Sequence, residues 1–413
     1  MPGFGWAIFR WTVRLTLLAG TVFLLVSDGV RDSPLAALPA GISPYTAILG
    51  LVSVGTLTLF GAAGLLMAAL SALRLRWFCR WVCPLGTCNE LSSQIGRRLR
   101  LRTPAFPRLG RDLVFLALGG ALLSSPILLW LDPLALFSGL GQRFAAEPWN
   151  RAVGLSGIAV AVTVSFFLPG LWCGRICPLG GLQEILFSVR RGLTGWVSQR
   201  LARPPLVDSV FQRETAPAAS LPEVGHVGRR VMLALAGGAV WAWVSPRLGA
   251  DETLPLRPPG ASPDDRRFLS LCVRCGNCVR VCPTGIVRPQ LFAGSPTAWL
   301  VPYVTFVSDY CLPNCNRCGA VCPSGALLPF SLTEKPVTVI GKAVLEGDLC
   351  LLSEDRECGI CRGHCPYHAI RLEFNEETYS VLPVVDLDRC PGCGACEAIC
   401  PTVPRKAIRV VRL

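Results

Sequence analysis

Sixteen cysteines between Cys272 and Pro401 constrain this chain more than any other feature of its sequence. They fall into four groups of four, and a proline follows the last cysteine of each group. The groups are Cys272, Cys275, Cys278 and Cys282; Cys311, Cys315, Cys318 and Cys322; Cys350, Cys358, Cys361 and Cys365; and Cys390, Cys393, Cys396 and Cys400. The first and last groups share the spacing Cys-x2-Cys-x2-Cys-x3-Cys-Pro, and the middle two are variants of it.

This spacing is typical of 4Fe–4S binding, in which three close thiolates hold one cluster and the fourth reaches a neighbouring cluster. A disulfide framework rarely repeats one spacing four times, and paired Cys-x2-Cys zinc motifs need no final Cys-Pro. The sequence therefore predicts four 4Fe–4S clusters in an α+β ferredoxin-like domain, held as two pairs. Sequential pairing of the groups (first with second, third with fourth) and nested pairing (first with fourth, second with third) both fit.

The first half of the chain is strongly apolar, and four of its segments approach the ~20 residues that cross a bilayer. They run at about 7–26, 45–70, 113–131 and 153–172. Residues 1–250 carry 23 Arg and 10 acidic residues, which accounts for the whole net charge of +13, whereas the charges of residues 251–413 cancel. The basic excess therefore belongs to the apolar half, which favours membrane topology over nucleic-acid binding as its explanation.

Arginine is unevenly distributed among the segments that connect these apolar runs. Nine Arg and one Glu lie from Arg74 to Arg111, and eight Arg lie from Cys173 to Arg230, whereas the other two connections hold one and two Arg. By the positive-inside rule, the N-terminus and both Arg-rich segments are cytoplasmic. We therefore expect an all-α membrane domain over residues 1–200, with four helices in two repeated pairs, in the cytoplasmic membrane.

The two helix pairs end in matching sequences, because residues 77–86 (WFCRWVCPLG) align with residues 171–180 (LWCGRICPLG). The cysteines of these two Cys-x3-Cys-Pro motifs are Cys79, Cys83, Cys173 and Cys177. Two copies of one unit can bring these four thiols together across a pseudo-twofold axis, which predicts a fifth iron–sulfur cluster. Buried structural thiols or redox-active pairs are the alternative. Cys88 has no counterpart in the second copy, and no role is assigned to it.

Residues 201–228 are rich in Pro, Ala and Ser and are predicted to be a cytoplasmic linker. Arg229 and Arg230 then precede an apolar run to Val244. Residues 229–250 resemble an internal twin-arginine export signal that stays as an anchor, and an ordinary fifth helix is the alternative. Either interpretation places a polyferredoxin domain, residues 251–413, on the extracytoplasmic side.

These motifs carry a family resemblance. The membrane half resembles the NapH/MauN family of membrane proteins through its two Cys-x3-Cys-Pro motifs. Residues from about 229 onward resemble the NapG/MauM family of exported ferredoxins, most clearly at residues 318–327 and 388–396. The chain as a whole is thus similar to a fusion of the two types.

The resemblance implies a membrane-anchored electron-transfer protein, the electron-transfer subunit of a quinol dehydrogenase. It would pass electrons from quinol to an extracytoplasmic cytochrome or reductase. Its expected partners are membrane lipid, the quinone pool and other subunits of a redox complex. Two alternatives stay open. The chain could be a maturation factor for a periplasmic redox enzyme, or it could wire a larger complex whose quinol site lies in another chain.

Two acidic residues occupy equivalent places in the repeats, because Glu90 and Glu184 each follow the second motif cysteine by seven residues. They are weak candidates for accepting the protons that quinol oxidation releases. The alternative is that they are solvated helix-surface acids paired with nearby arginines. His364, between Cys361 and Cys365, is expected on the surface, since a complete cysteine set needs no further ligand.

Overall fold

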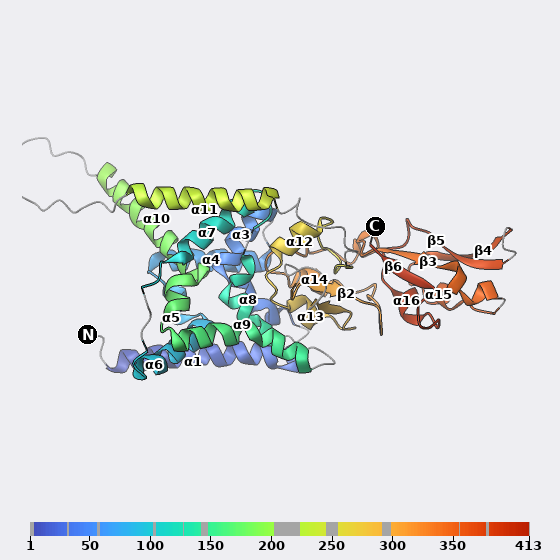
Figure 1. The fold of residues 1–413 in the computed structure, drawn as a ribbon, viewed down its shortest axis with the longest axis horizontal. Helices are drawn as coiled ribbons and strands as arrows, with labels where there is room; N and C mark the ends of the chain where they lie inside the picture. Colours follow the sequence, from blue (N-terminus) through green and yellow to red (C-terminus); the bar gives the residue numbers. More distant parts are fainter. Residues whose placement is uncertain are drawn as a thin grey trace, which may run out of the picture.

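The computed structural model describes residues 4–30, 33–55, 58–101, 105–126, 128–141, 148–201, 224–244, 255–290, 299–354, 356–376 and 380–412. Its two parts lie end to end along the long axis of the molecule, with a helical part that ends at Val244 and a mixed part that begins at Pro255 (Figure 1). The N-terminus lies at the end of the helical part that is remote from the mixed part.

The helix α1 (Phe4–Val26) runs along the outside of the helical part. Within the described residues it alone contains a stretch long and apolar enough to cross a membrane, Gly5–Val26, with a mean hydropathy of 1.5. Only 11% of its most apolar window is buried, so α1 is not the core helix of a water-soluble bundle. The other three predicted spans have no described helix that meets the same criterion.

The single span predicted at 45–70 is wrong. The helix α3 (Pro44–Val54) ends at Gly55, whose φ of +73° is the left-handed conformation that glycine adopts most easily. A second helix, α4 (Leu59–Leu73), begins after its N-cap Thr58. The two helices pack side by side so closely that a Cβ on Gly64 would lie 2.5 Å from that of Ala47. The segment is therefore a helical hairpin.

Further helices, both short and long, complete each repeat. In the first they are η1 (Asp28–Val30), η2 (Pro34–Ala37), α2 (Leu38–Gly41), α5 (Trp77–Trp81) and α6 (Pro84–Arg98). The second contains α7 (Leu109–Leu122), η3 (Leu129–Leu131), α8 (Pro133–Ser138), η4 (Gly139–Gly141), α9 (Pro148–Phe167), η5 (Trp172–Ile176) and α10 (Pro178–Leu201). The apolar segment predicted at 113–131 is therefore split between α7 and η3.

The two repeats meet through equivalent helix starts in the core. Ser43-Pro44 begins α3 and Asp132-Pro133 begins α8, with each polar residue as the N-cap. The Ser43 hydroxyl donates to the Asp132 carboxylate over 2.9 Å, and the Thr46 hydroxyl donates to it over 3.2 Å. Both turns are fully buried, so they join the repeats in the interior.

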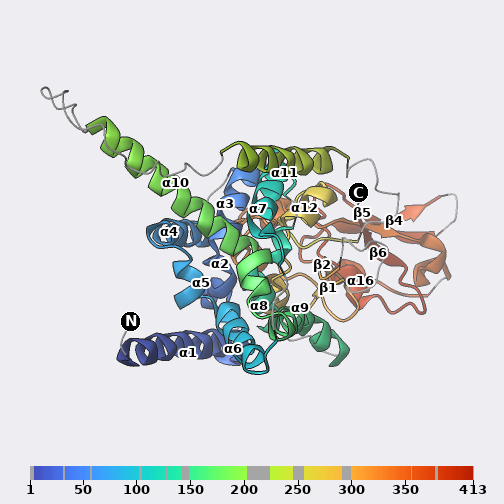
Figure 2. The ribbon, with the colours of Figure 1, turned by 60° about the vertical axis from the view of Figure 1, so that its left-hand side comes forward.

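The predicted fifth helix is α11 (Val224–Val244), which starts inside the predicted linker. It runs alongside α7 in both views (Figures 1 and 2). A Cβ on Gly238 would lie 2.0 Å from the Leu116 carbonyl oxygen, so the two backbones touch at a position that only glycine allows. Residues 202–223 of the predicted linker and 245–254 lie outside the described residues.

The mixed part consists of short helices and short strands, in agreement with the predicted α+β class, and its strands form three two-stranded antiparallel sheets. The paired strands are β1 (Val287–Pro289) with β2 (Pro302–Val304), β3 (Lys342–Leu345) with β6 (Ile408–Val411), and β4 (Ile370–Asn375) with β5 (Ser380–Val385). The helices are α12 (Asp265–Leu271), α13 (Asn277–Val281), α14 (Arg317–Ala320), α15 (Ile360–Gly363) and α16 (Ala395–Ile399), with η8 (Lys335–Val337), η9 (Gly347–Leu349) and η10 (Leu351–Glu354).

The mixed part rests directly on the helical part. The Arg267 guanidinium donates to the Ser53 carbonyl at the end of α3 over 3.2 Å, and that of Arg274 lies 5.2 Å from the Trp130 ring centroid. In addition, Val281 and Val321 form one buried apolar cluster with Ala37 and Phe60. The first two cysteine groups therefore lie nearest to the helices, and the last two lie farther out (Figure 1).

Candidate iron–sulfur sites

The first two cysteine groups exchange their fourth members. Cys322 interacts electrostatically with the first three cysteines of the first group, and Cys282 does so with Cys311 and Cys318 of the second. We name the resulting sets set 1 (Cys272, Cys275, Cys278 and Cys322) and set 2 (Cys311, Cys315, Cys318 and Cys282). The helices α13 and α14, which carry the third cysteine of each group, pack against each other and make this exchange possible.

The last two groups exchange members in the same way. Cys365 interacts electrostatically with Cys393 and Cys396 of the fourth group, and Cys400 interacts with Cys350 of the third. These are set 3 (Cys390, Cys393, Cys396 and Cys365) and set 4 (Cys350, Cys358, Cys361 and Cys400). Of the two arrangements that the spacing allowed, the structure therefore has the sequential one, first with second and third with fourth.

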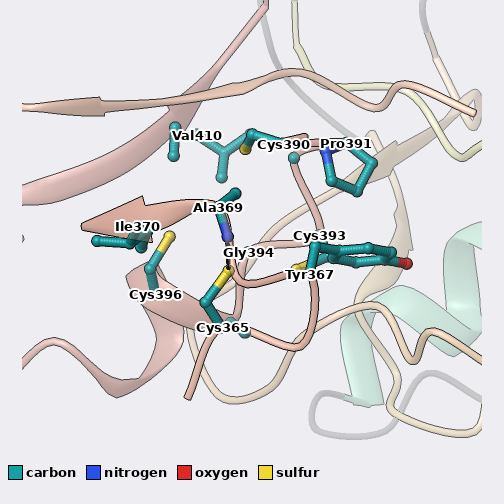
Figure 3. A pocket seen from close by; sticks show the side chains of 13 residues that line it. Cys365, Tyr367, Ala369, Ile370, Cys390, Pro391, Cys393, Gly394, Cys396 and Val410 are labelled. Atoms are coloured by element: carbon teal, nitrogen blue, oxygen red, sulfur yellow. Dashed lines mark hydrogen bonds between the residues drawn. The ribbon is translucent and has the colours of Figure 1, made fainter. Parts of the chain in front are cut away.

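Set 3 surrounds a cavity, which all four of its cysteines line (Figure 3). The rest of the lining is largely apolar and includes Ala369, Ile370 and Val410. Backbone N–H groups point at the sulfurs of the exchanged cysteines: that of Ala369 donates to Cys365 over 3.4 Å, and that of Leu327 donates to Cys322 over 3.3 Å. Apolar walls and N–H donors to sulfur are the environment that a thiolate-bound cluster requires.

The chemistry of these thiols also fits iron–sulfur ligation. Burial raises the pKa of Cys275 to about 12, with Cys322 and Cys272 adding to the effect. Burial likewise raises the pKa of Cys318 and of Cys393 to about 12. Four crowded, buried thiols ionise together only when positive charge stabilises them, and the iron of a bound cluster supplies that charge.

Two other uses of the cysteines do not match their arrangement. All 21 cysteines are free thiols, so the segment is no disulfide framework. In the ranges that the structure describes, no three His, Cys, Asp or Glu side chains are arranged to hold a single metal ion.

The four cysteines of the helical part also converge. Cys79 and Cys173 interact electrostatically with each other and with Cys83 and Cys177. A side-chain amide of each repeat donates a hydrogen bond to the first motif cysteine of the other repeat. The Gln183 amide donates to the Cys79 sulfur over 2.9 Å, and the Asn89 amide donates to the Cys173 sulfur over 3.5 Å. We name these cysteines the inner set.

The two predicted acids are paired with arginines. Glu90 accepts hydrogen bonds from Arg10, over 3.2 Å, and from Arg14. Glu184 accepts them from Arg76 over 2.6 Å and from Arg111 over 3.0 Å. The paired interpretation describes them better than the catalytic one, but Glu184 is buried and Glu90 half-buried, so neither is a fully solvated surface acid.

His364 lies on the surface, where it was expected, whereas no place was predicted for Cys88. His364 is exposed, and its Nδ1 lies 3.1 Å from the Ile360 carbonyl oxygen. Cys88 is half-buried against the helical core and belongs to none of the sets.

Four polar residues of these sites escaped the sequence analysis. Asn89 and Gln183 occupy equivalent places in the two repeats, and that equivalence could have revealed them. The contacts of Asp132 with Ser43 and Thr46, and of Lys335 with Cys311, have no local signal, because these partners come from segments remote in sequence.

Comparison with known proteins bears on both parts. Residues 271–326 and 356–403 match the model of the 4Fe–4S dicluster domain, and each match contains one exchanging pair or most of one. Residues 47–102 and 150–196 match the model of a 4Fe–4S binding domain, and each match holds one Cys-x3-Cys-Pro motif. Iron–sulfur binding is thus supported in both parts of the chain.

The methylamine utilization ferredoxin-type protein MauM of Methylorubrum extorquens is 36% identical over 183 residues, which cover 43% of this chain and 81% of MauM. The chain belongs to the MauM family of ferredoxin-type proteins. The ferredoxin-type protein NapG of Escherichia coli is 37% identical over 166 residues, or 38% of this chain and 71% of NapG. The ferredoxin-type protein NapH of the same organism is 33% identical over 121 residues, or 27% of this chain and 39% of NapH, so that likeness is partial. No solved structure matches the chain.

Proposed function

We propose that this MauM-family protein is a membrane-embedded electron carrier that receives electrons from quinol and delivers them to a redox partner beyond set 4. Each bound 4Fe–4S cluster accepts and releases one electron. In this proposal, sets 1 to 4 hold one cluster each and the inner set holds a fifth.

The observation that carries the proposal is the unbroken row of cysteine sets. Cys278 of set 1 interacts with Cys318 of set 2. The Cys311 N–H of set 2 donates to the Cys393 carbonyl of set 3 over 2.9 Å, and Cys396 of set 3 interacts with Cys361 of set 4. Neighbouring carriers this close allow direct electron transfer, so the row supports a relay along the long axis.

The outward-facing side chains of the helical part support its place in a membrane. Many of its large apolar residues face the surroundings, far more than a monomeric water-soluble domain exposes. They include Phe9, Leu15, Phe23, Leu66, Val160, Phe167, Leu233 and Val240. The glycine contact between α7 and α11 supports a retained anchor rather than a leader that is cleaved.

The buried turns of the repeats shorten the path between the inner set and set 1. Tyr45, at the start of α3, interacts with Cys177, whereas Ser53, at the other end of that helix, contacts the mixed part. Because eight residues separate Ser53 from Tyr45 in α3, the two points are only about 12 Å apart along the helix axis. Electrons therefore need not traverse a whole bilayer between the inner set and set 1.

The two ends of the row have different surroundings. Cys275 of set 1 belongs to the same buried cluster as the helical core, whereas most residues around Cys358 and Cys361 of set 4 are exposed. This difference supports entry at the helices and exit at set 4, to a cytochrome or reductase. The Glu90 and Glu184 ion pairs lie at the helical end and could take up quinol protons only by giving up their arginines.

The test uses the purified full chain in lipid nanodiscs. We expect roughly twenty iron atoms per chain, or roughly sixteen if the inner set holds no cluster, and added quinol should reduce EPR-active clusters. Clusters that dithionite reduces and quinol does not would contradict quinol input and favour a wiring subunit.

A deletion strain separates this proposal from a maturation role. Electron delivery predicts that the partner enzyme keeps its cofactor and works with an artificial donor. A partner that lacks its cofactor would favour maturation.

A further inference from the structure

Lysine is rare in this chain, and each copy touches a cysteine of a predicted cluster site. Of the 40 Lys and Arg residues, only three are Lys. The Lys335 ammonium donates to the Cys311 sulfur over 3.0 Å. The Lys342 ammonium donates to the Cys390 carbonyl over 2.8 Å, and that of Lys406 donates to the Cys400 carbonyl. Lys335 therefore differs from the other two in contacting a sulfur atom.

The Lys335 side chain is also the most enclosed of the three, with 2% exposure. Its Nζ lies 5.2 Å from the centroid of the Phe330 ring, which adds a cation–π contact. The adjacent acid, Glu334, instead accepts hydrogen bonds from the Ser331 N–H over 2.7 Å and from its hydroxyl over 2.9 Å. A buried ammonium is costly without a negative partner, and the thiolate of Cys311 is the partner that this geometry supplies.

We propose that Lys335 raises the reduction potential of the cluster held by set 2, an inference that rests on the proposed assignment of a cluster to that set. Four thiolates make such a site net negative, and reduction adds one further electron. A fixed positive charge at a ligand sulfur stabilises the reduced form more than the oxidised one, and the low dielectric of the interior strengthens the effect. Reduction at this site adds one electron and breaks no bond.

Because Lys335 lies beside set 2, a raised reduction potential there changes how electrons move along the row of clusters. Cys311 is also the residue whose N–H joins set 2 to set 3 through the Cys393 carbonyl. A raised potential at set 2 favours transfer from set 1 and retains the electron midway, at the junction of the two dicluster units. A lysine suits this role better than an arginine because its compact ammonium can direct one charge at one sulfur.

The experiment is an EPR-monitored redox titration of the purified full chain, with Lys335→Met compared with the wild type. The step that belongs to set 2 is identified as the one that Cys315→Ser abolishes. We expect that step to move to a more negative potential in Lys335→Met while the other steps and the iron content stay unchanged. Lys342→Met is the matched control, and it should leave the set 2 step in place.

An unchanged set 2 potential in an iron-replete Lys335→Met protein would overturn the inference and leave the proposed function intact. If Lys335→Met loses iron, the neutral donor variant Lys335→Gln is titrated in the same way, and the same result is decisive. Iron loss in both variants would make Lys335 a structural residue and likewise overturn the inference. Absence of any set 2 signal in the wild type would instead overturn the proposed assignment of clusters.

Discussion

The two parts of the molecule bring four cysteines together by different means. In the mixed part, three cysteines of each set come from one short loop, and only the fourth arrives from another group. In the inner set, each repeat supplies two cysteines, and side-chain amides from the opposite repeat hydrogen-bond to two of them. Outer sites are thus encoded mostly by local spacing, and the inner site depends on how two distant repeats pack.

The exchange of fourth cysteines makes the strongest prediction about the outer sets. Although Cys322 belongs to the second group, Cys322→Ser should remove the cluster of set 1, a loss of roughly four iron atoms per chain. The lost EPR signal should be the one that Cys275→Ser also loses. Cys88→Ser is the control, since Cys88 belongs to no set, and its iron content should stay complete. Loss of different signals in the two ligand variants would refute the exchange.

A second prediction concerns the ion pairs that tie the ends of the mixed part together. Asp265 accepts hydrogen bonds from Arg257 over 2.7 Å and from Arg412 over 2.6 Å, and it is nearly fully buried. Asp265→Asn leaves both guanidinium groups uncompensated, so it should lower the free energy of unfolding of this part by about 3–5 kcal/mol. Thermal unfolding measures the loss. Glu346→Gln is the control, because its ion pair with Arg409 is exposed and contributes about 0–1 kcal/mol.

The same aspartate gives this stability a defined pH dependence. Burial raises the pKa of Asp265, but the hydrogen bonds and charges of Arg257 and Arg412 outweigh burial and hold that pKa below its ordinary value. A lowered folded-state pKa stabilises the fold at pH values above the unfolded pKa of about 3.9 and loses that contribution as the pH falls below it. The stability difference between wild type and Asp265→Asn should therefore shrink only in acid. A constant difference down to the lowest pH would contradict this assignment.

The smallest expected effect tests the inner set. Gln183 bridges the site, since its carbonyl accepts from the Phe78 N–H over 3.1 Å while its amide donates to Cys79. Gln183→Leu should cost about 1–3 kcal/mol of stability, because it leaves a buried N–H without a partner, and it should speed alkylation of Cys79. Asn89→Leu is the matched comparison, with a smaller expected effect because its contact with Cys173 is longer, at 3.5 Å. If the two variants lose equal stability, the hydrogen bond from the Phe78 N–H to Gln183 contributes nothing to the stability of the fold.

Much of the mixed part was predictable, because the spacing around a cluster-binding loop is a local property. Its α+β architecture and the position of His364 followed from the motifs. In the helical part the repeat and its motifs were visible, whereas the hairpin of α3 and α4 was not. An apolar run of 26 residues has the same hydropathy pattern whether it forms one helix or is interrupted at Gly55. Only the packing of Ala47 against Gly64 distinguishes the hairpin from a single helix.

By itself the sequence determined which cysteines form loops, that two halves with different charge balance follow each other, and that the apolar half is duplicated. These are properties of spacing and composition, and folding does not change them. The tertiary structure alone decided that the groups pair sequentially, which arginines bind Glu90 and Glu184, and that a buried lysine contacts Cys311. Those outcomes depend on contacts between segments far apart in the chain, whose energies no local pattern records.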